Sequence, residues 1–165
     1  MKIYGVTGWK NSGKTGLMER LIAEFSARGF SVSSIKHAHH TVDVDHPGKD
    51  SYRHRVAGAQ EVVLATQSRI AIMQELRGTD EPSLQDLLQR LSPVDLVLIE
   101  GYKRDRHPKI ECRRSETAQT LIAVDDPTIR AIASDGPVET NRPVFDLNDT
   151  VAIADYISTE LNLGA

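Results

Sequence analysis

Apolar and polar positions along the chain follow two periods, which alternate from one end to the other. Short continuous or alternating apolar runs predict strands, and apolar residues three and four positions apart predict helices with one buried face. The predicted strands cover residues 2–8, 30–36, 61–66, 69–76, 94–101, 109–114, 120–125, 129–134 and 143–147. The predicted helices cover residues 14–28, 51–59, 83–91 and 150–161.

Strands that alternate with amphipathic helices predict an α/β fold, a mostly parallel sheet flanked by helices. Residues 61–66 and 69–76 are separated only by Gln67 and Ser68, which predicts a local β-hairpin added to this sheet. The length of 165 residues fits one domain over residues 1–165. Ligands of such sheets bind beyond the carboxyl ends of the strands, so we expect the loops after residues 8, 36, 100 and 125 along one edge.

Two of the predicted helices carry clear local signals. Gly29 follows the first helix as a C-terminal stop, and Ser83 is placed as the N-cap of the third. The buried stripe of the first helix is expected to consist of Leu17, Leu21, Ile22 and Phe25.

A phosphate-binding motif stands between the first strand and the first helix. The sequence GWKNSGKT, residues 8–15, matches G-x-x-x-x-G-K-[ST] at every fixed position. Glycines let successive backbone N–H groups curl around phosphate oxygens, and the helix N-terminus adds a favourable dipole. Lys14 would reach the β- and γ-phosphates and Thr15 would coordinate Mg²⁺. The predicted nucleotide-binding residues of this P-loop are Gly8, Trp9, Lys10, Asn11, Ser12, Gly13, Lys14 and Thr15.

A second anchor of the site is expected at the end of another buried strand. P-loop proteins hold the magnesium ion, directly or through water, with an acid in that position. The sequence DLVLIEGYK places Glu100 there, so Thr15 and Glu100 are the predicted metal residues. Asp95, at the opposite end of the same strand, is interpreted as structural.

The loop after the second strand is rich in histidine and allows three interpretations. Residues 36–55 hold five of the six histidines and three aspartates. A metal site is one interpretation, although the spacing matches no compact zinc motif; its ligands would be His37, His39, His40 and His46 beside Asp43 and Asp45. A solvated polar loop is the second interpretation.

In the third interpretation this loop receives an anion, either nucleotide phosphate or a second ligand. The cations available are Lys36, Lys49, Arg53 and Arg55. Asp43 or Asp45 would approach the magnesium ion as mobile switch segments do. Lys14, Glu100 and Asp45 are therefore the candidate catalytic residues, and Lys36 joins the predicted nucleotide-binding residues.

Composition narrows the class of protein. The formal net charge of −3 gives no reason to expect binding to nucleic acid or to an anionic membrane. Cys112 is the single cysteine, which excludes an intramolecular disulfide and fits a reducing compartment. The sequence holds neither a signal-peptide pattern nor an apolar run of membrane-spanning length, so we expect a cytoplasmic protein.

The base of the nucleotide is not identified by a motif. Guanine-specific proteins often carry Asn/Thr-Lys-x-Asp near the late strands, and the chain has no such tetrapeptide. Asp125 or Asp126, after a predicted late strand, could accept hydrogen bonds from a guanine, while Asp126 could equally cap the turn before Pro127. The residues alone leave GTP and ATP both open.

Three blocks together resemble the molybdopterin-guanine dinucleotide biosynthesis protein B family. They are TGWKNSGKTGLMERLI, IKHAHHTVDVDHPGKDSYRHRVAGA and DLVLIEGYK, and the similarity is clearest up to about residue 115. The resemblance implies a GTP- and Mg²⁺-binding protein with weak GTPase activity that commonly dimerises. It also implies an accessory role in attaching GMP to molybdopterin, alongside a molybdopterin guanylyltransferase and with molybdopterin as a candidate second ligand. The implied switch-like segment is the loop around Asp43, Asp45 and Lys49.

Three functions are open, one of which is a purely structural dimeric binding module that binds nucleotide tightly and releases no phosphate. Another is a nucleotide-dependent adapter whose slow hydrolysis fits the lack of an evident catalytic base for water. The third is a small-molecule kinase that uses ATP, with residues 103–109 as a cationic lid. The apolar hairpin could also pair with a second chain to form a homodimer, or be covered internally.

Overall fold

A computed structural model of the protein describes residues 1–38, 43–117 and 119–164. Its contacts divide the chain into two compact units, residues 1–37 with 90–165 and residues 38–89. We call them the sheet unit and the hairpin unit. The prediction of one domain over the whole chain did not reveal this division.

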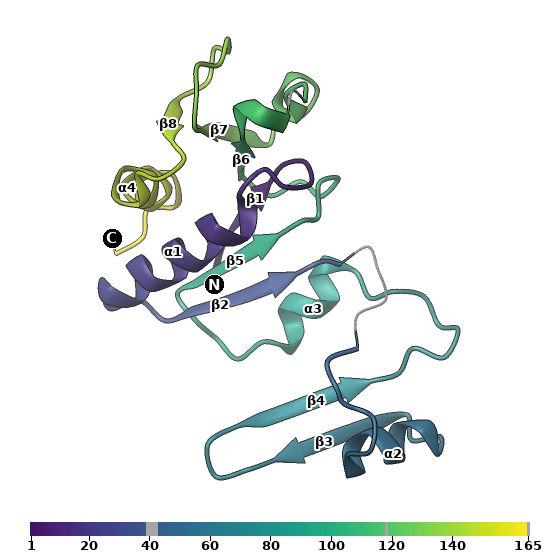
Figure 1. The fold of residues 1–165 in the computed structure, drawn as a ribbon. Helices are drawn as coiled ribbons and strands as arrows, with labels where there is room; N and C mark the ends of the chain where they lie inside the picture. The colour runs from purple at the N-terminus through teal and green to yellow at the C-terminus, as the bar shows by residue number, and fades with distance from the viewer. Residues whose placement is uncertain (39–42, 118, 165) are drawn as a thin grey trace. The chain divides into compact units, whose positions relative to one another are not determined.

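The sheet unit is built on six parallel strands in the order β2-β5-β1-β6-β7-β8 (Figure 1). The prediction of a mostly parallel sheet flanked by helices is therefore confirmed. The strands are β1 (Lys2–Thr7), β2 (Val32–Lys36), β5 (Leu96–Glu100), β6 (Lys109–Arg113), β7 (Ile129–Ser134) and β8 (Val144–Asp146). The helices are α1 (Lys14–Ala27), α4 (Thr150–Leu161) and the short 3₁₀ turns η1 (Ser115–Thr117) and η2 (Ile122–Val124).

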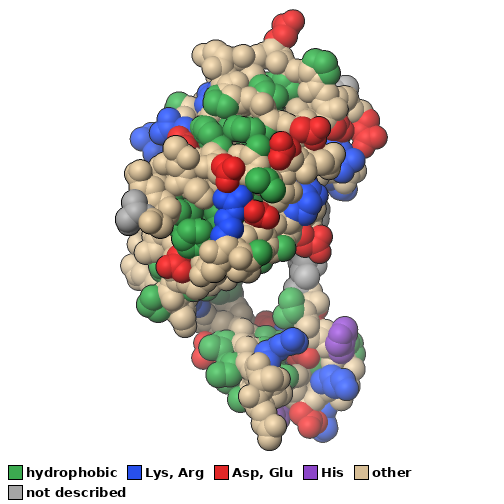
Figure 2. Space-filling model, turned by 90° about the vertical axis from the view of Figure 1, so that its left-hand side faces the viewer, with side chains coloured by type: hydrophobic (Ala, Val, Ile, Leu, Met, Phe, Trp, Pro, Cys, Tyr) green, Lys and Arg blue, Asp and Glu red, His purple; other side chains and the backbone are tan. Residues whose placement is uncertain are grey.

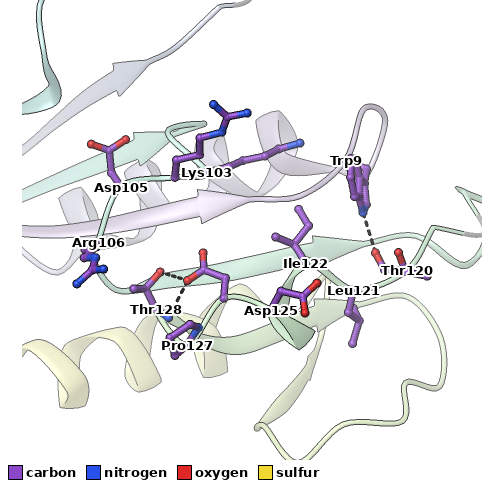
Figure 3. Close-up of a pocket in the computed structure, with 12 residues that line it drawn as sticks. Trp9, Lys103, Asp105, Arg106, Thr120, Leu121, Ile122, Asp125, Pro127 and Thr128 are labelled. Carbon is purple, nitrogen blue, oxygen red and sulfur yellow. Dashed lines mark hydrogen bonds between the residues drawn. The ribbon is translucent and has the colours of Figure 1, made fainter.

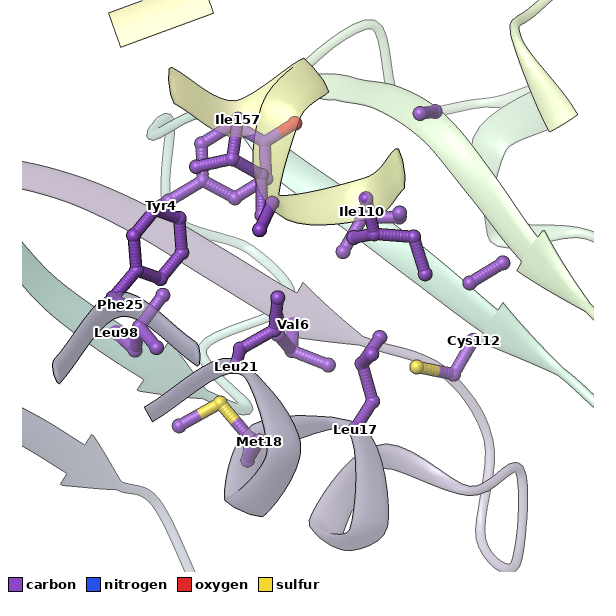
Figure 4. Close-up of a cluster of buried hydrophobic side chains, with 14 of the residues drawn as sticks. Tyr4, Val6, Leu17, Met18, Leu21, Phe25, Leu98, Ile110, Cys112 and Ile157 are labelled. Carbon is purple, nitrogen blue, oxygen red and sulfur yellow. The ribbon is translucent and has the colours of Figure 1, made fainter. Parts of the chain in front are cut away.

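One face of this sheet is covered by α1 and α4, which pack against each other (Figures 1 and 4). The stripe predicted for the first helix is largely confirmed: three of its four residues are fully buried and Ile22 is partly buried. Side chains from the central strands complete a continuous apolar core, which fixes the strand ends that carry the site. Its buried members include Tyr4, Val6, Leu17, Leu21, Phe25, Leu98, Ile110, Ile153 and Ile157.

The strand predicted at residues 120–125 is wrong. This segment contains η2 instead, because the buried Glu111 carboxylate accepts the backbone N–H groups of Ile122 (2.9 Å) and Ala123 (2.8 Å). The acceptor satisfies the free N–H groups at the start of a helical turn, which an extended segment would not present together. An apolar run therefore became a turn through a contact with a residue eleven and twelve positions away.

The hairpin unit contains α2 (Asp50–Val56), β3 (Glu61–Ala65) and β4 (Ile70–Gln74), and α3 (Leu84–Arg90) begins within it. The predicted hairpin is confirmed, since β3 and β4 are antiparallel, but among the described residues these two strands pair only with each other. They form a separate sheet and not an extension of the six-stranded one. Ser83 caps α3 as expected, accepting the backbone N–H of Asp86 at 3.2 Å.

The surface carries both signs of charge. The face seen in Figure 2 shows both acidic and basic side chains, with several acidic ones side by side at its upper right. Among the helices of the described residues, none combines the length and the apolarity that a membrane span requires.

Candidate nucleotide-binding site

The P-loop leaves β1 at a position that only glycine tolerates. Gly8 has φ 141°, and a Cβ there would lie 2.5 Å from the backbone oxygen of Cys112 and 2.5 Å from Ser12 Oγ. Gly13, directly before α1, has φ 92°, and a Cβ there would lie 3.0 Å from Leu147. Both glycines thus serve the close approach of backbone to neighbouring chain, as a phosphate-wrapping loop requires.

Lys14 is held across the loop. Its ammonium group donates to the backbone oxygen of Trp9 at 2.6 Å. Burial lowers the pKa of Lys14, although the nearby Glu100 charge acts in the opposite direction. A partly buried cation with this arrangement is stabilised by an incoming anion, which is what a phosphate supplies.

Thr15, Lys36 and Glu100 converge where α1 begins and where β2 and β5 end. Thr15 Oγ1 donates to Glu100 Oε1 at 3.3 Å, and Lys36 Nζ lies 3.3 Å from the same oxygen. The sheet explains the convergence, since Lys36 and Glu100 are register partners at the ends of β2 and β5. The prediction that the loops after residues 8, 36 and 100 share one edge is confirmed.

This geometry suits a magnesium ion. Mg²⁺ prefers oxygen ligands and keeps several waters, so one hydroxyl and one carboxylate at a phosphate site are a sufficient protein contribution. Thr15 and Glu100 supply that pair from a helix start and a buried strand end. Asp95, in contrast, accepts the Ser31 hydroxyl at 2.6 Å at the start of β5, which is the structural role expected for it.

Two residues that sequence reasoning missed line the cavity beside the loop. This cavity of about 360 Å³ lies against residues 11–16, Arg114 and Glu116. Arg114 directly follows β6, so its position was available from the rule that ligands bind beyond strand ends. Its signal was lost because the two arginines that end KIECRR look like an ordinary solvated strand end.

Asp125 is not where the sequence placed it. The acid ends η2, before β7 and not after a strand, so it does not belong to the edge that carries Lys36 and Glu100. It lies instead in a second cavity together with Trp9 of the P-loop. Its neighbour Asp126 accepts Thr128 and pairs with the buried Lys109, which supports the structural alternative for that residue.

Asp43 and Asp45 belong to the hairpin unit, where they surround one arginine. The Arg55 guanidinium lies 2.9 Å from Asp43, 3.3 Å from Asp45 and 2.6 Å from Glu75. Asp45 also accepts Ser51 Oγ at 3.1 Å. These contacts join the loop, α2 and the end of β4, and the catalytic role of Asp45 stays a prediction.

The remaining cations of this loop are not gathered into a cluster. Arg53 pairs loosely with Asp50 at 3.7 Å on the surface of α2, and Lys49 is exposed at its start. Within residues 1–38, 43–117 and 119–164 no group of three or more His, Cys, Asp or Glu side chains is arranged to hold a metal. His39 and His40, named in the metal interpretation, lie outside the described residues.

Comparison with known proteins places the chain in a family. The family model for "Molybdopterin guanine dinucleotide synthesis protein B" (MobB) matches residues 3–135. The molybdopterin-guanine dinucleotide biosynthesis adapter protein of Haemophilus influenzae is 43% identical over 97% of this chain and 89% of its own length. The adapter protein of the same name from Escherichia coli is 40% identical over 94% and 90%.

Solved structures agree with these relatives. The MobB homolog from Bacillus stearothermophilus has a TM-score of 0.73 at 29% identity and covers 98% of this chain and 99% of its own. Bacillus subtilis MobB has a TM-score of 0.74 at 28% identity and covers 98% of both chains. Since the family model spans most of the chain and the two relatives above are 43% and 40% identical to it, the chain belongs to the molybdopterin guanine dinucleotide synthesis protein B (MobB) family.

Proposed function

We propose that the protein binds GTP with Mg²⁺ at the P-loop, hydrolyses it slowly, and acts as an adapter in the biosynthesis of molybdopterin guanine dinucleotide. The adapter role is supported by the family and by the names of its relatives. A molybdopterin guanylyltransferase is the expected partner enzyme, as the resemblance to the family implies.

One observation carries the nucleotide part of this proposal. Thr15, Lys36 and Glu100 meet within 3.3 Å beside a loop whose Lys14 is folded back over it. Lys14 would hold the β- and γ-phosphates, and Thr15 with Glu100 would hold the metal that screens their charge. Slow turnover is expected, since no side chain of the sheet unit's described residues is placed as an evident base for water.

The test is calorimetric titration of the full chain with GTPγS and with ATPγS in magnesium. We expect preference for the guanine nucleotide and a Kd raised about thirtyfold or more in Lys14→Ala, because a partly buried cation that pairs with the phosphates is removed. Lys2→Ala is the matched control, because Lys2 is exposed at the end of β1 away from the P-loop, and it should change the Kd little. Equal binding by Lys14→Ala would overturn the P-loop assignment.

The competing function is a small-molecule kinase, and one observation favours it. Residues 103–106 line a cavity together with Trp9 of the P-loop, as an acceptor site would. A kinase prefers ATP and forms ADP in proportion to a phosphorylated acceptor. Preference for ATPγS in the titration would move this function to first place.

The role proposed for Asp45 has its own measurement. If the Asp45 carboxylate approaches the metal during turnover, Asp45→Asn lowers the rate of GTP hydrolysis while the Kd for GTPγS stays unchanged. An unchanged rate would remove Asp45 from the catalytic residues and leave its contacts with Ser51 and Arg55 as its only role.

We also propose a homodimer formed through the hairpin. Val63 and Ile72 are register partners on one face of β3 and β4, and Ile70 lies beside them. Their exposed fractions are 57%, 64% and 68%. Contiguous exposed apolar side chains on a two-stranded sheet are typical of an interface.

A further inference from the structure

A second cavity of about 680 Å³ lies in the sheet unit (Figure 3). Its walls come from the segment that leads from β5 to β6, the segment that leads from β6 to β7, and one side chain of the P-loop. The volume is within the range of small-molecule sites and exceeds what a bound water or ion needs. Phosphate binding and metal binding, assigned to the P-loop, leave this cavity without a role.

Trp9 makes the wall on the P-loop side. Its indole N–H donates to the backbone oxygen of Thr120 at 2.7 Å, which fixes the ring plane, and Lys103 Nζ lies 4.4 Å from the ring centroid. Leu121 and Ile122 add an apolar surface beside it. A fixed aromatic ring with an apolar floor suits a flat ligand that stacks.

The charged side chains are divided between the two segments. Arg104 and Arg106 stand on one, and neither has a carboxylate partner among the described residues. Asp125 stands on the other, exposed and with no hydrogen bond to its carboxylate from any described residue. In the view of Figure 3, Arg106 lies at the end of the cavity away from Trp9, and Asp125 lies between them.

The other two acids of the lining are less available. Asp126 is engaged by Thr128 and by the buried Lys109. Asp105 lies beside the arginines on its own segment, where its carboxylate offsets part of their charge. The cavity therefore offers one acceptor near the aromatic wall and cations farther along it.

We propose that this cavity binds a fused 2-amino-4-oxopyrimidine ring that carries an anionic group. Such a ring presents an N–H and an NH₂ side by side, and the two oxygens of Asp125 can accept both. The ring stacks against Trp9, and its anionic substituent pairs with the guanidinium group of Arg106. Lys103 leaves the indole face to join that anion.

Guanine and pterins share this ring edge, so two sources satisfy the same chemistry. In one case the ring is the base of the nucleotide held by the P-loop. In the other it is a separate pterin. Where the ring is the base of the nucleotide, the assignment rests on the proposed nucleotide binding; where it is a separate pterin, the assignment is independent of that binding.

The experiment uses the fluorescence of Trp9, the single tryptophan of the chain. The full chain and its Lys14→Ala variant are titrated with pterin-6-carboxylate, GMP and AMP. We expect saturable quenching by pterin-6-carboxylate or GMP and not by AMP, which lacks the paired donors. Asp125→Asn should raise the Kd about tenfold or more, since it leaves a ring donor opposed by an amide N–H₂. Asp80→Asn removes an exposed carboxylate of the hairpin unit and is the matched control.

The two sources give different results, and both support the cavity. A separate pterin binds to Lys14→Ala as it does to the unchanged chain, and it binds together with GTPγS. A base of the P-loop nucleotide makes GTPγS compete with pterin-6-carboxylate, and Asp125→Asn then weakens GTPγS as well. Absence of saturable quenching by both rings at about millimolar concentration, or quenching by AMP equal to that by GMP, would overturn the proposal. Either failure leaves the calorimetric result for GTPγS and Lys14→Ala standing by itself.

Discussion

The P-loop edge of the sheet unit and the Arg55 cluster of the hairpin unit both bring together charged side chains from three segments of the chain. The helices and strands that carry these side chains differ in how deeply they are buried. Glu100 ends a strand whose five residues are all buried, in a sheet with a continuous apolar core. Arg55 projects from a seven-residue helix without buried residues, beside a hairpin in which Val62 alone is buried. The first arrangement is held by packing and the second largely by its charges.

Because of this difference, the two groups of charged side chains suit different roles. Lys14 and Lys36 share one nearby acid, Glu100, so their edge gains from an added anion. Arg55 has three acids around it, and its guanidinium group already donates to all of them. Cations with too few acidic partners at rigid strand ends favour a binding site for an anion. An arginine whose acidic partners are all present, on a small helix, favours a structural role, here holding the loop, α2 and the end of β4 together.

The largest expected effect comes from breaking the rigid edge. Gly8→Ala places a Cβ against the Cys112 backbone oxygen at an unfavourable φ, and we expect a loss of about 2–4 kcal/mol in the free energy of unfolding. Denaturant unfolding followed by Trp9 fluorescence measures it. Gly29→Ala is the control, since Gly29 also has positive φ but no atom within 4 Å of its Cβ, and about 1 kcal/mol is expected there. Equal losses in the two variants would contradict the clash.

The apolar hairpin face gives the next effect, on association. Ile72→Lys places a charge in the middle of the exposed apolar side chains, and we expect the dimer dissociation constant to rise about tenfold or more. Sedimentation velocity over a range of concentrations measures it. Ser68→Lys adds the same charge at the hairpin turn, outside that face, and should leave the constant nearly unchanged. A chain that is monomeric before mutation removes the proposed dimer.

Removing the ion pairs of Arg55 should destabilise the hairpin unit and leave the sheet unit unchanged. Arg55→Leu leaves three acids without their common partner, so amide hydrogen exchange in β3 and β4 should become about tenfold faster while α1 is unchanged. Arg53→Leu removes a neighbouring arginine with only a loose surface pair and serves as the control. Equal protection in both variants would show that packing, not charge, holds the hairpin unit.

The sequence predicted the rigid region well and the charge-held region poorly. The P-loop, Glu100 and Lys36 were found because motif spacing and strand ends fix their positions through local rules. Those local rules do not predict the order of the strands in the sheet, and they do not predict that the hairpin is separate from the main sheet.

Other parts depended on contacts between distant residues. The turn at residues 122–124 forms because Glu111 supplies acceptors from another strand, which no local pattern reveals. Arg55 appeared in the sequence as a candidate anion receptor, but its three acids come from residues as far apart as 43 and 75. Trp9 stood inside the motif at a variable position, so the cavity that it lines was not predicted.

The smallest expected effect is the loss of stability at acid pH, which should occur in a different pH range in each unit. Burial lowers the pKa of His107 to about 4, with Lys109 acting in the same direction and Asp105 and Asp126 opposing it. As the pH falls, this histidine is therefore protonated at a higher pH in the unfolded chain than in the folded chain. The sheet unit should lose about 1 kcal/mol of stability as the pH falls from about 6.5 towards 4.

The hairpin unit should respond in a lower window. The backbone N–H of Asp45 and the Arg55 guanidinium lower the pKa of Asp43, so its contribution is complete above about pH 4 and is lost as the pH falls further. Hydrogen exchange, corrected for its intrinsic pH dependence, reports both units in one series. His107→Leu should abolish the upper window in the sheet unit. It replaces a buried side chain, whose ring nitrogens have no hydrogen-bond partner among the described residues, with an apolar one. His54→Leu, which removes an exposed histidine of the hairpin unit, should leave that window intact. An upper window that survives His107→Leu would assign it to another group of the sheet unit whose pKa is lower in the folded chain than in the unfolded one.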